Sequence, residues 1–356
     1  MGMRQRLVEL VIAAAAIVFA VMAVSLAGES PLGGASLLRF YLRGILSPLR
    51  MLTAWLVVFY LISFYLSLPQ LFPLPAIFRK TVGLPPLLTP AELLDYGRRF
   101  LVRLRRTLSI IIPGVLALVS LSLALDAMNA WNASRLRDEL LLGLDRLLTA
   151  SYPFIELTAI PYPPWFISAV IVSFHYLVPA IFMLPAYLSQ RHYPLFRQFA
   201  AAFFVSTLLS FPGWLLTPAL SPHDRFIDNV YQRSLSSEIA AALDRYKPSP
   251  AVARFLADVR QSKDRELGGV MPTSTMPSAH VAWAVLLVYY GWRALPLISL
   301  LTIPLAILST LGTVLLAQHY AIDIPAGVVV ALLGIAIARR IALLEHRAAA
   351  AAGSRV

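Results

Sequence analysis

Residues 318–341 read QHYAIDIPAGVVVALLGIAIARRI, and this stretch decides the fold. The apolar run over 322–341 is long enough to cross a membrane as a helix, because a helical span needs roughly 20 such residues. His319 and Asp323 stand at the start of that run. Ionisable groups at the mouth of a membrane span are costly to place there, so they indicate function.

Similar apolar runs recur along the chain. The 356 residues are 59% hydrophobic and only 13% charged, whereas a soluble domain carries about 25% charged residues. The sequence therefore predicts an all-α fold, a polytopic integral membrane helical bundle with about eight transmembrane helices. The first run is interpreted as an uncleaved span rather than a signal peptide. The predicted spans are about 7–26, 51–69, 107–125, 165–188, 199–219, 280–294, 295–316 and 322–341.

Charge along the chain predicts the orientation of the bundle. With the N-terminus inside, 16 of the 30 lysines and arginines fall on the inner side with only four acids. Positive residues favour the cytoplasmic side, so both termini are expected to be cytoplasmic and His319 exoplasmic. The net charge of +12 then reflects membrane topology, and no nucleic-acid partner is expected. The absence of cysteine excludes disulfides and thiolate chemistry.

Two outer segments are long enough to build a site. Residues 136–148 have the pattern of an amphipathic helix, which is expected to lie in the membrane interface. The polar loop 220–275 is expected to cap a site at the outer surface, with helices near 236–246 and 251–261.

Two short strings carry the chemistry. His319 and Asp323 are one helical turn apart and share a face, so the carboxylate can orient the imidazole. Met276-Pro277-Ser278-Ala279-His280 opens another span, where Thr275, Ser278 and free backbone N–H groups can bind phosphate. Taken alone, the first pair could merely pin two spans together, and the second string could be ordinary helix capping.

The two strings together resemble a known family. Pro277-Ser278-Ala279-His280 is similar to the P-S-x-H signature of the type 2 phosphatidic acid phosphatase (PAP2) superfamily, and His319-Tyr320-Ala321-Ile322-Asp323 to its H-x-x-x-D motif. The form H-Y-x-x-D with Ala326-Gly327 after it resembles the inositol phosphorylceramide synthase and sphingolipid synthase branch. The resemblance covers about 130–356 and includes the string Gly143-Leu144-Asp145-Arg146.

The resemblance implies roles for three residues. His319 would take the phosphoryl group as nucleophile, His280 would protonate the leaving alkoxide, and Asp323 would orient His319. It implies no cofactor and no metal. The apolar runs add two N-terminal transmembrane helices and a cytoplasmic loop over 1–105, outside the resemblance. A PAP2-like catalytic membrane domain with a six-helix core and the outer loop 220–275 is expected over 106–347, followed by a cytoplasmic tail over 348–356.

The chain departs from the family pattern at its arginines. Gly312 and Thr313 stand where the phosphatase form has Ser-Arg, and the first motif, K-x6-R-P, is absent. Arg225, with His223, is then the best substitute for binding phosphate. A site poor in cations suits a singly charged phosphodiester better than a phosphomonoester dianion.

These points predict a metal-independent lipid phosphotransferase in a membrane, most simply a prokaryotic plasma membrane. It would move a phosphoryl or phospho-head group, such as phosphoinositol, from a phospholipid donor to a lipid alcohol acceptor. The alternative is a lipid or polyprenyl phosphate phosphatase, with water as acceptor. A proton-coupled transporter, or an enzyme that holds a metal with His280, His319 and Asp323, are further alternatives from other classes. The sequence gives no oligomeric state.

Overall fold

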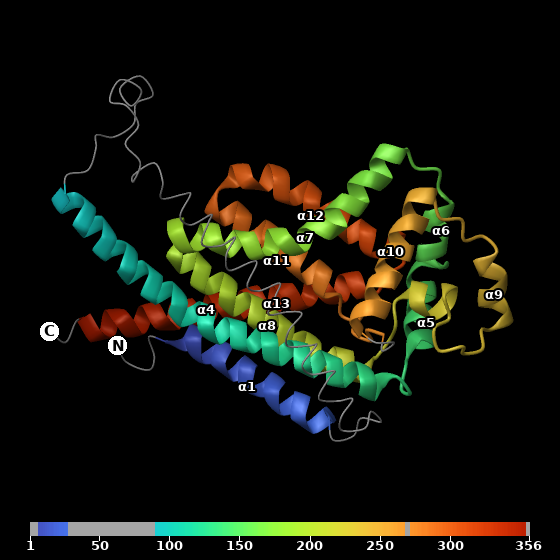
Figure 1. Cartoon of the computed structure of the whole chain (residues 1–356), viewed down its shortest axis with the longest axis horizontal. Coiled ribbons are helices and arrows are strands. Elements are labelled where there is room, and N and C mark those ends of the chain that lie inside the picture. The colour runs from blue at the N-terminus through green and yellow to red at the C-terminus, as the bar shows by residue number, and fades with distance from the viewer. Residues whose placement is uncertain (1–5, 28–89, 268–270, 354–356) are drawn as a thin grey trace.

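The computed structural model describes residues 6–27, 90–267 and 271–353. The regular elements of these residues are all helices. Seven long helices form a bundle, as Figure 1 shows. They are α1 (Leu7–Ala27), α4 (Pro90–Asn132), α7 (Pro164–Arg191), α8 (Tyr193–Leu216), α11 (Ala279–Ala294), α12 (Ser299–Leu315) and α13 (Asp323–Gly353).

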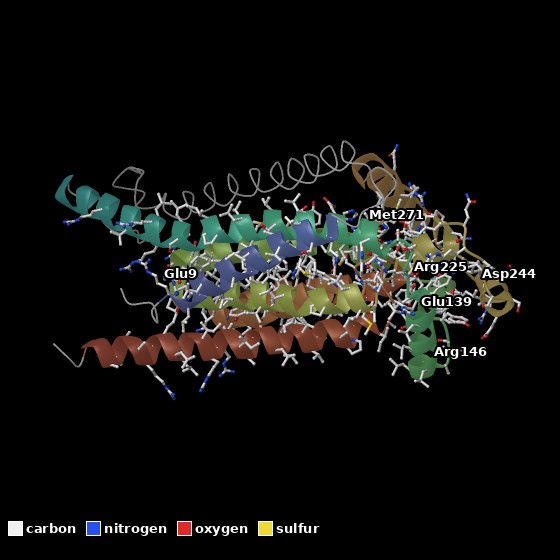
Figure 2. All side chains as sticks on the ribbon, turned by 90° about the horizontal axis from the view of Figure 1, so that it is seen from below. Glu9, Glu139, Arg146, Arg225, Asp244 and Met271 are labelled. Atoms are coloured by element: carbon white, nitrogen blue, oxygen red, sulfur yellow. The ribbon has the colours of Figure 1, made fainter. Side chains whose placement is uncertain are left out.

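Four further helices gather at one end of the bundle, away from the two chain ends (Figure 1). They are α5 (Asp138–Thr149), α6 (Pro153–Ala159), α9 (Ser237–Leu243) and α10 (Pro250–Leu267), and we call them the cap. A π-helical turn, His223–Ile227, joins the cap to α8, and a 3-10 turn, Pro296–Ile298, joins α11 to α12. Figure 2 shows Glu9 at the end opposite Glu139, Arg146 and Asp244 of the cap.

The predicted membrane bundle is confirmed. Six helices of the described part are long and apolar enough to cross a membrane: α1, α4, α7, α8, α12 and α13. The predicted division between 280–294 and 295–316 is present, because α11 ends at Ala294 and α12 begins at Ser299. With 16 residues, α11 is not one of the six helices. The predicted span 51–69 lies outside the described residues, as does most of the segment 1–105.

The helix α8 lies at the centre of the bundle. Residues 199–207 are buried without a break, and α13, α1, α11 and α7 pack around the helix. A helix that is apolar on all sides is buried on all sides. The outer helices instead expose large apolar side chains, such as Leu301 at 78% and Val24 at 76%, as expected for surfaces that face lipid.

The helices of the cap agree with the sequence prediction. Those predicted near 236–246 and 251–261 are present as α9 and α10. The amphipathic helix is present as α5, whose inner face carries the buried Asp138 and Asp145 beside Leu141 and Leu142. Its outer face exposes Leu147 and Leu148, and its position in the membrane interface stays a prediction.

Candidate active site

The two strings singled out in the sequence meet at the cap end of the bundle. The Ser278 backbone N–H donates to the Asp323 carbonyl at 3.3 Å, and Ser278 Oγ lies 3.3 Å from His319 Nε2. His319 Nδ1 lies 3.1 Å from the Thr275 carbonyl oxygen. Segments some 40 residues apart in the chain therefore form one polar cluster, in which Ser278 and Asp323 are fully buried.

The groups around His319 determine which of its ring nitrogens carries the proton. Nδ1 faces two acceptors, the Thr275 carbonyl and Asp323 Oδ2, each at 3.1 Å. Neither group can donate to a ring nitrogen when the carboxyl is ionised, so Nδ1 carries the proton. In the neutral ring Nε2 then bears the free lone pair, and Ser278 Oγ donates to it. This tautomer is the one that a nucleophilic imidazole needs.

The His280 ring lies close to that of His319. His280 is the second residue of α11 and is half-buried, with its ring centroid 6.0 Å from that of His319. Phe174 of α7 stacks on it at 4.6 Å with the planes 5° apart, and Trp283 lies 5.9 Å away. Aromatic contacts on two sides hold the His280 ring in place while leaving it close to His319.

Local geometry explains why Ser278 begins a helix here. Its hydroxyl accepts a hydrogen bond from the Val281 N–H at 3.4 Å, the usual contact of a helix N-cap. Helix α13 approaches the Ser278 backbone closely at Gly327, where an added Cβ would lie 2.6 Å from the Ser278 carbonyl oxygen. The glycine after the second string is therefore required for the two strings to meet.

Two carboxylates of α5 hold the turn that carries His319. Asp145 accepts from the Ala321 N–H at 3.0 Å and from the Ile322 N–H at 2.8 Å. Asp138 accepts from the Tyr320 hydroxyl at 3.0 Å and from the Leu220 N–H at 2.8 Å. Both side chains are buried. The cap helix thus fixes the backbone on the C-terminal side of the candidate nucleophile.

Burial shifts the titration of both groups. It raises the pKa of Asp145 to about 6, although the hydrogen bonds from Ala321 and Ile322 favour the ionised form. It likewise raises the pKa of Asp138 to about 6, against the hydrogen bonds from Tyr320 and Leu220. Removal of a carboxylate from water disfavours its charge, so both groups titrate close to neutral pH.

Two of the four predicted phosphate-binding residues contact His319, and the other two pair with acidic side chains. Thr275 and Ser278 are at the His319 cluster, and Thr275 Oγ1 is buried without a hydrogen-bond partner. Arg225 is buried but engaged: its guanidinium pairs with Glu139 at 2.9 Å and bonds the Ser234 carbonyl at 3.3 Å. His223 donates its backbone N–H to the Ala317 carbonyl at 3.0 Å, while its ring lies 3.4 Å from Asp228. The roles of both remain predictions.

One group of side chains in the described residues has the spacing to share a metal ion: His223, Asp224 and Asp228. Its acids already have cationic partners, since Lys263 pairs with Asp224 at 2.6 Å and Arg260 with Asp228 at 3.1 Å. Burial also lowers the pKa of His223. The cluster is explained as an ion-pair network that ties α10 to the π-helical turn.

Sequence reasoning missed the residues that support the site from α4 and α5. Asn132 Nδ2 donates to the Trp214 carbonyl at 3.2 Å and to Thr273 Oγ1 at 3.1 Å, and Asn129 accepts from the Thr273 N–H at 2.9 Å. These contacts fix the segment that leads to Thr275. The only sign of this role in the sequence is that Asn129 and Asn132 stand three residues apart at the end of an apolar run. Asp145 belongs to a quoted string, but its role depends on a contact 176 residues away.

Comparison with known proteins identifies the family to which the chain belongs. No curated protein and no solved structure matched the chain. A family model described as the PAP2 superfamily matches residues 140–337, which run from α5 to α13 and include both strings. This match covers more than half of the chain, and the protein therefore belongs to the PAP2 superfamily, whose members are phosphatases and phosphotransferases.

Proposed function

We propose that the protein is a lipid phosphotransferase that works through a phosphohistidine at His319. The single observation that carries this proposal is the pair of acceptors at His319 Nδ1, Asp323 and the Thr275 carbonyl, which leaves the lone pair of the neutral ring on Nε2, in a cluster that also holds His280. Membership of the PAP2 superfamily supports lipid phosphatase or phosphotransferase chemistry. The two-histidine arrangement supplies a nucleophile and a proton donor for it.

In the first half of the reaction, His319 Nε2 attacks the phosphorus of a phospholipid donor. The N–P bond forms as the bond from phosphorus to the lipid alkoxide breaks. Protonated His280 gives its proton to the departing oxygen, and ionised Asp323 stabilises the positive charge on the His319 ring. The buried Thr275 hydroxyl, which has no hydrogen-bond partner, is available to donate to a phosphoryl oxygen. The Ser278 hydroxyl can do the same once the N–P bond has taken up the Nε2 lone pair that accepts from it.

In the second half, neutral His280 takes the proton from the hydroxyl of a lipid alcohol. That oxygen attacks phosphorus, the N–P bond breaks, and the electron pair returns to His319 Nε2. His280 is protonated again and ready for the next donor. The acid of one step is the base of the next, as microscopic reversibility requires.

The polar environment favours a phosphodiester donor. Thr313 occupies the position where the phosphatase form of the motif has arginine. Its backbone carbonyl accepts a hydrogen bond from the His319 N–H at 2.8 Å, and its side chain adds no charge to the site. Arg225 is neutralised by Glu139. A phospholipid phosphodiester has a single charge and needs fewer cations than a terminal phosphate. The resemblance of His319-Tyr320 and Ala326-Gly327 to inositol phosphorylceramide synthases makes phosphoinositol our first candidate head group.

The orientation and domain organisation remain part of the proposal. Six of the arginines assigned to the inner side, among them Arg197, Arg293 and Arg339, line one cavity at the end of the bundle away from the His319 cluster. The positive-inside tendency then places His319 toward the exoplasmic side of a prokaryotic plasma membrane, with both termini in the cytoplasm. Residues 106–347 would carry the catalysis, and 1–105 would be accessory.

The assay that tests this function compares two acceptors. Purified protein is given radiolabelled phosphatidylinositol in mixed micelles, with and without ceramide or diacylglycerol. Transfer predicts a labelled lipid product that requires the lipid alcohol. Release of free phosphate from phosphatidic acid or a prenyl diphosphate, with no acceptor-dependent lipid product, would identify the protein as a phosphatase of the same superfamily instead.

A further inference from the structure

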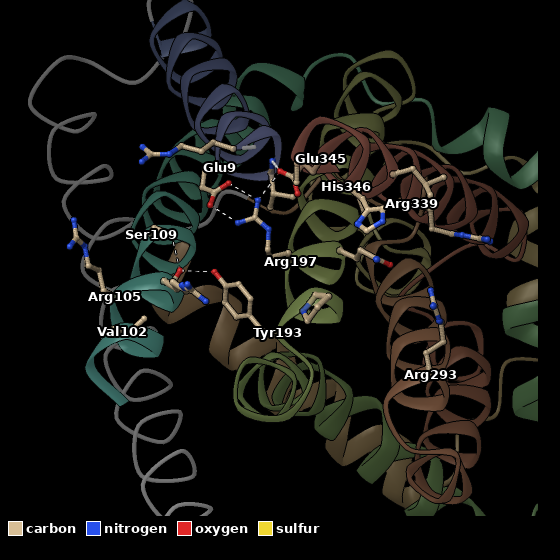
Figure 3. Close-up of a pocket in the computed structure, with 18 residues that line it drawn as sticks. Glu9, Val102, Arg105, Ser109, Tyr193, Arg197, Arg293, Arg339, Glu345 and His346 are labelled. Atoms are coloured by element: carbon tan, nitrogen blue, oxygen red, sulfur yellow. Dashed lines mark hydrogen bonds and ion pairs between the residues drawn. The ribbon is translucent and has the colours of Figure 1, made fainter. Parts of the chain in front are cut away.

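The end of the bundle opposite the cap contains a large basic cavity. It has a volume of about 1300 Å³ and lies between α1, α4, α8, α11 and α13. Figure 3 shows Arg197, Arg293 and Arg339 around it, with Arg105 on the facing side. Six arginines line this space, two of them adjacent in α4: Arg6, Arg105, Arg106, Arg197, Arg293 and Arg339.

The positive charge of the cavity exceeds the negative charge. Glu9 and Glu345 are its acidic lining residues, and both pair with Arg197, at 2.5 Å and 2.7 Å (Figure 3). In the described part of the chain, no carboxylate forms a salt bridge with the other five arginines. Among the described lining residues, six guanidinium groups and two carboxylates give an excess of four positive charges, so the cavity attracts an anion. Guanidinium groups bind phosphate well because they offer paired donors.

An apolar groove begins beside this cavity. It lies between α4, α7 and α8, with Ile110 one helical turn beyond Arg106 and Phe196 next to Arg197. Farther along α4, a second hollow shares Leu118, Phe182 and Phe203 with the first. The two have volumes of about 130 and 230 Å³. A basic cavity that continues into an apolar groove along the helices matches a ligand with an anionic head group and an apolar chain.

We infer that this end of the bundle binds an anionic phospholipid, with its phosphate head group among the arginines and an acyl chain along α4 and α8. Basic pockets between membrane helices are suited to such head groups. A free phosphate or other soluble anion would use the arginines but would gain nothing from the groove, which is why we choose the lipid. The site is separate from the His319 cluster and does not depend on the chemistry proposed there.

The test uses matched charge removals. Arg105→Gln with Arg339→Gln removes two cations that line the cavity, whereas Arg191→Gln with Arg340→Gln removes two exposed cations that do not line it. Full-length protein in detergent is stripped of lipid and titrated with phosphatidylglycerol, with phosphatidylcholine or with inorganic pyrophosphate. Bound lipid is counted by native mass spectrometry, and pyrophosphate binding is measured by calorimetry.

The inference predicts saturable binding of phosphatidylglycerol but not of phosphatidylcholine. The lining pair should weaken it by roughly 10- to 30-fold, since each arginine contributes about fivefold, and the control pair should change it less than about twofold. Gly114→Leu, which fills the groove near Phe204 at ordinary contact distance, should also weaken lipid binding. Equal losses in the lining and control pairs would overturn the inference, as would tight pyrophosphate binding with no preference for phosphatidylglycerol.

Discussion

The Asp145 carboxylate on α5 accepts a hydrogen bond from the Ile322 backbone N–H at 2.8 Å, across 177 residues of sequence. Its other oxygen accepts from Ala321 at 3.0 Å. Both donors belong to the turn between His319 and Asp323. The cap is therefore a structural part of the candidate active site, because it determines where the turn that carries His319 lies.

Asp145→Asn should reduce the rate without unfolding the protein. An amide has one acceptor oxygen, so one of the two N–H groups loses its partner, at a cost of about 1–3 kcal/mol. If that cost appears in the positioning of His319, kcat falls roughly 5- to 100-fold while KM changes little. Steady-state kinetics would measure this, with Asp244→Asn, at an exposed position of the cap, as the control. A normal kcat in Asp145→Asn would show that the turn holds its position without the carboxylate.

His319→Ala and His280→Ala should each abolish turnover of the natural phospholipid, but for different reasons. The nucleophile is lost in the first and the proton donor in the second, and a general acid contributes typically 10²–10⁴-fold. A donor with a p-nitrophenol leaving group needs no proton. It should restore release of the phenol in His280→Ala and leave His319→Ala inactive. The opposite pattern would reverse the two assignments.

Asp323→Asn should lose a large part of the rate but not all of it. The carboxylate is fully buried and bonds His319 Nδ1 and the Tyr320 N–H, both at 3.1 Å. The Thr275 carbonyl also accepts from Nδ1, so the reactive tautomer keeps one partner in the variant. We expect a loss on the order of 100-fold, less than that of His319→Ala. Equal losses in the two variants would mean that Asp323 does more than orient and stabilise the ring.

The stability of the cap should depend on pH through Asp138 and Asp145. Burial raises the pKa of each from 3.8 to about 6, so the folded protein binds these protons more tightly than the unfolded chain. Their contribution to the free energy of unfolding is complete below pH 3.8 and is lost as the pH rises through about 6. Thermal unfolding of the wild type and of Asp138→Asn/Asp145→Asn, followed by fluorescence, would measure it. The stability difference between them should fall over this range; a constant difference would refute the shift.

Arg197→Gln should destabilise the bundle at the end away from the cap. It leaves Glu9 and Glu345 side by side and without their partner, and a broken buried pair costs about 3–5 kcal/mol. The three side chains are 13–18% exposed, so solvent screens the charges and we expect about half that cost. The unfolding temperature in detergent should drop well below that of Arg191→Gln, an exposed cation at the same end. Equal unfolding temperatures would mean that water replaces the guanidinium.

The sequence was sufficient for features that depend on neighbours in the chain. The apolar runs predicted α7, α8 and α13, and the division between 280–294 and 295–316 predicted the end of α11. These inferences succeeded because helix periodicity and membrane thickness set the positions of the residues. The resemblance assigned His280 and His319 to one site, and their rings lie 6.0 Å apart, while their roles stay predictions.

The sequence was insufficient where the partner is distant. Arg197 pairs with Glu9 and Glu345, which are 188 and 148 residues away. Asp138 and Asp145 belong to the predicted amphipathic helix, and they accept hydrogen bonds from Tyr320 and Ile322. No local pattern encodes such contacts, because they depend on how the helices pack.

The most direct test of the central claim is to isolate the covalent intermediate. The protein is mixed with a phospholipid donor in the absence of a lipid alcohol, quenched at alkaline pH and digested for mass spectrometry. The account predicts a phosphoryl or phospho-head-group adduct on His319 that disappears when the alcohol is added. An adduct on another residue, or one that persists in His319→Ala, would contradict it, as would turnover with no adduct under any condition.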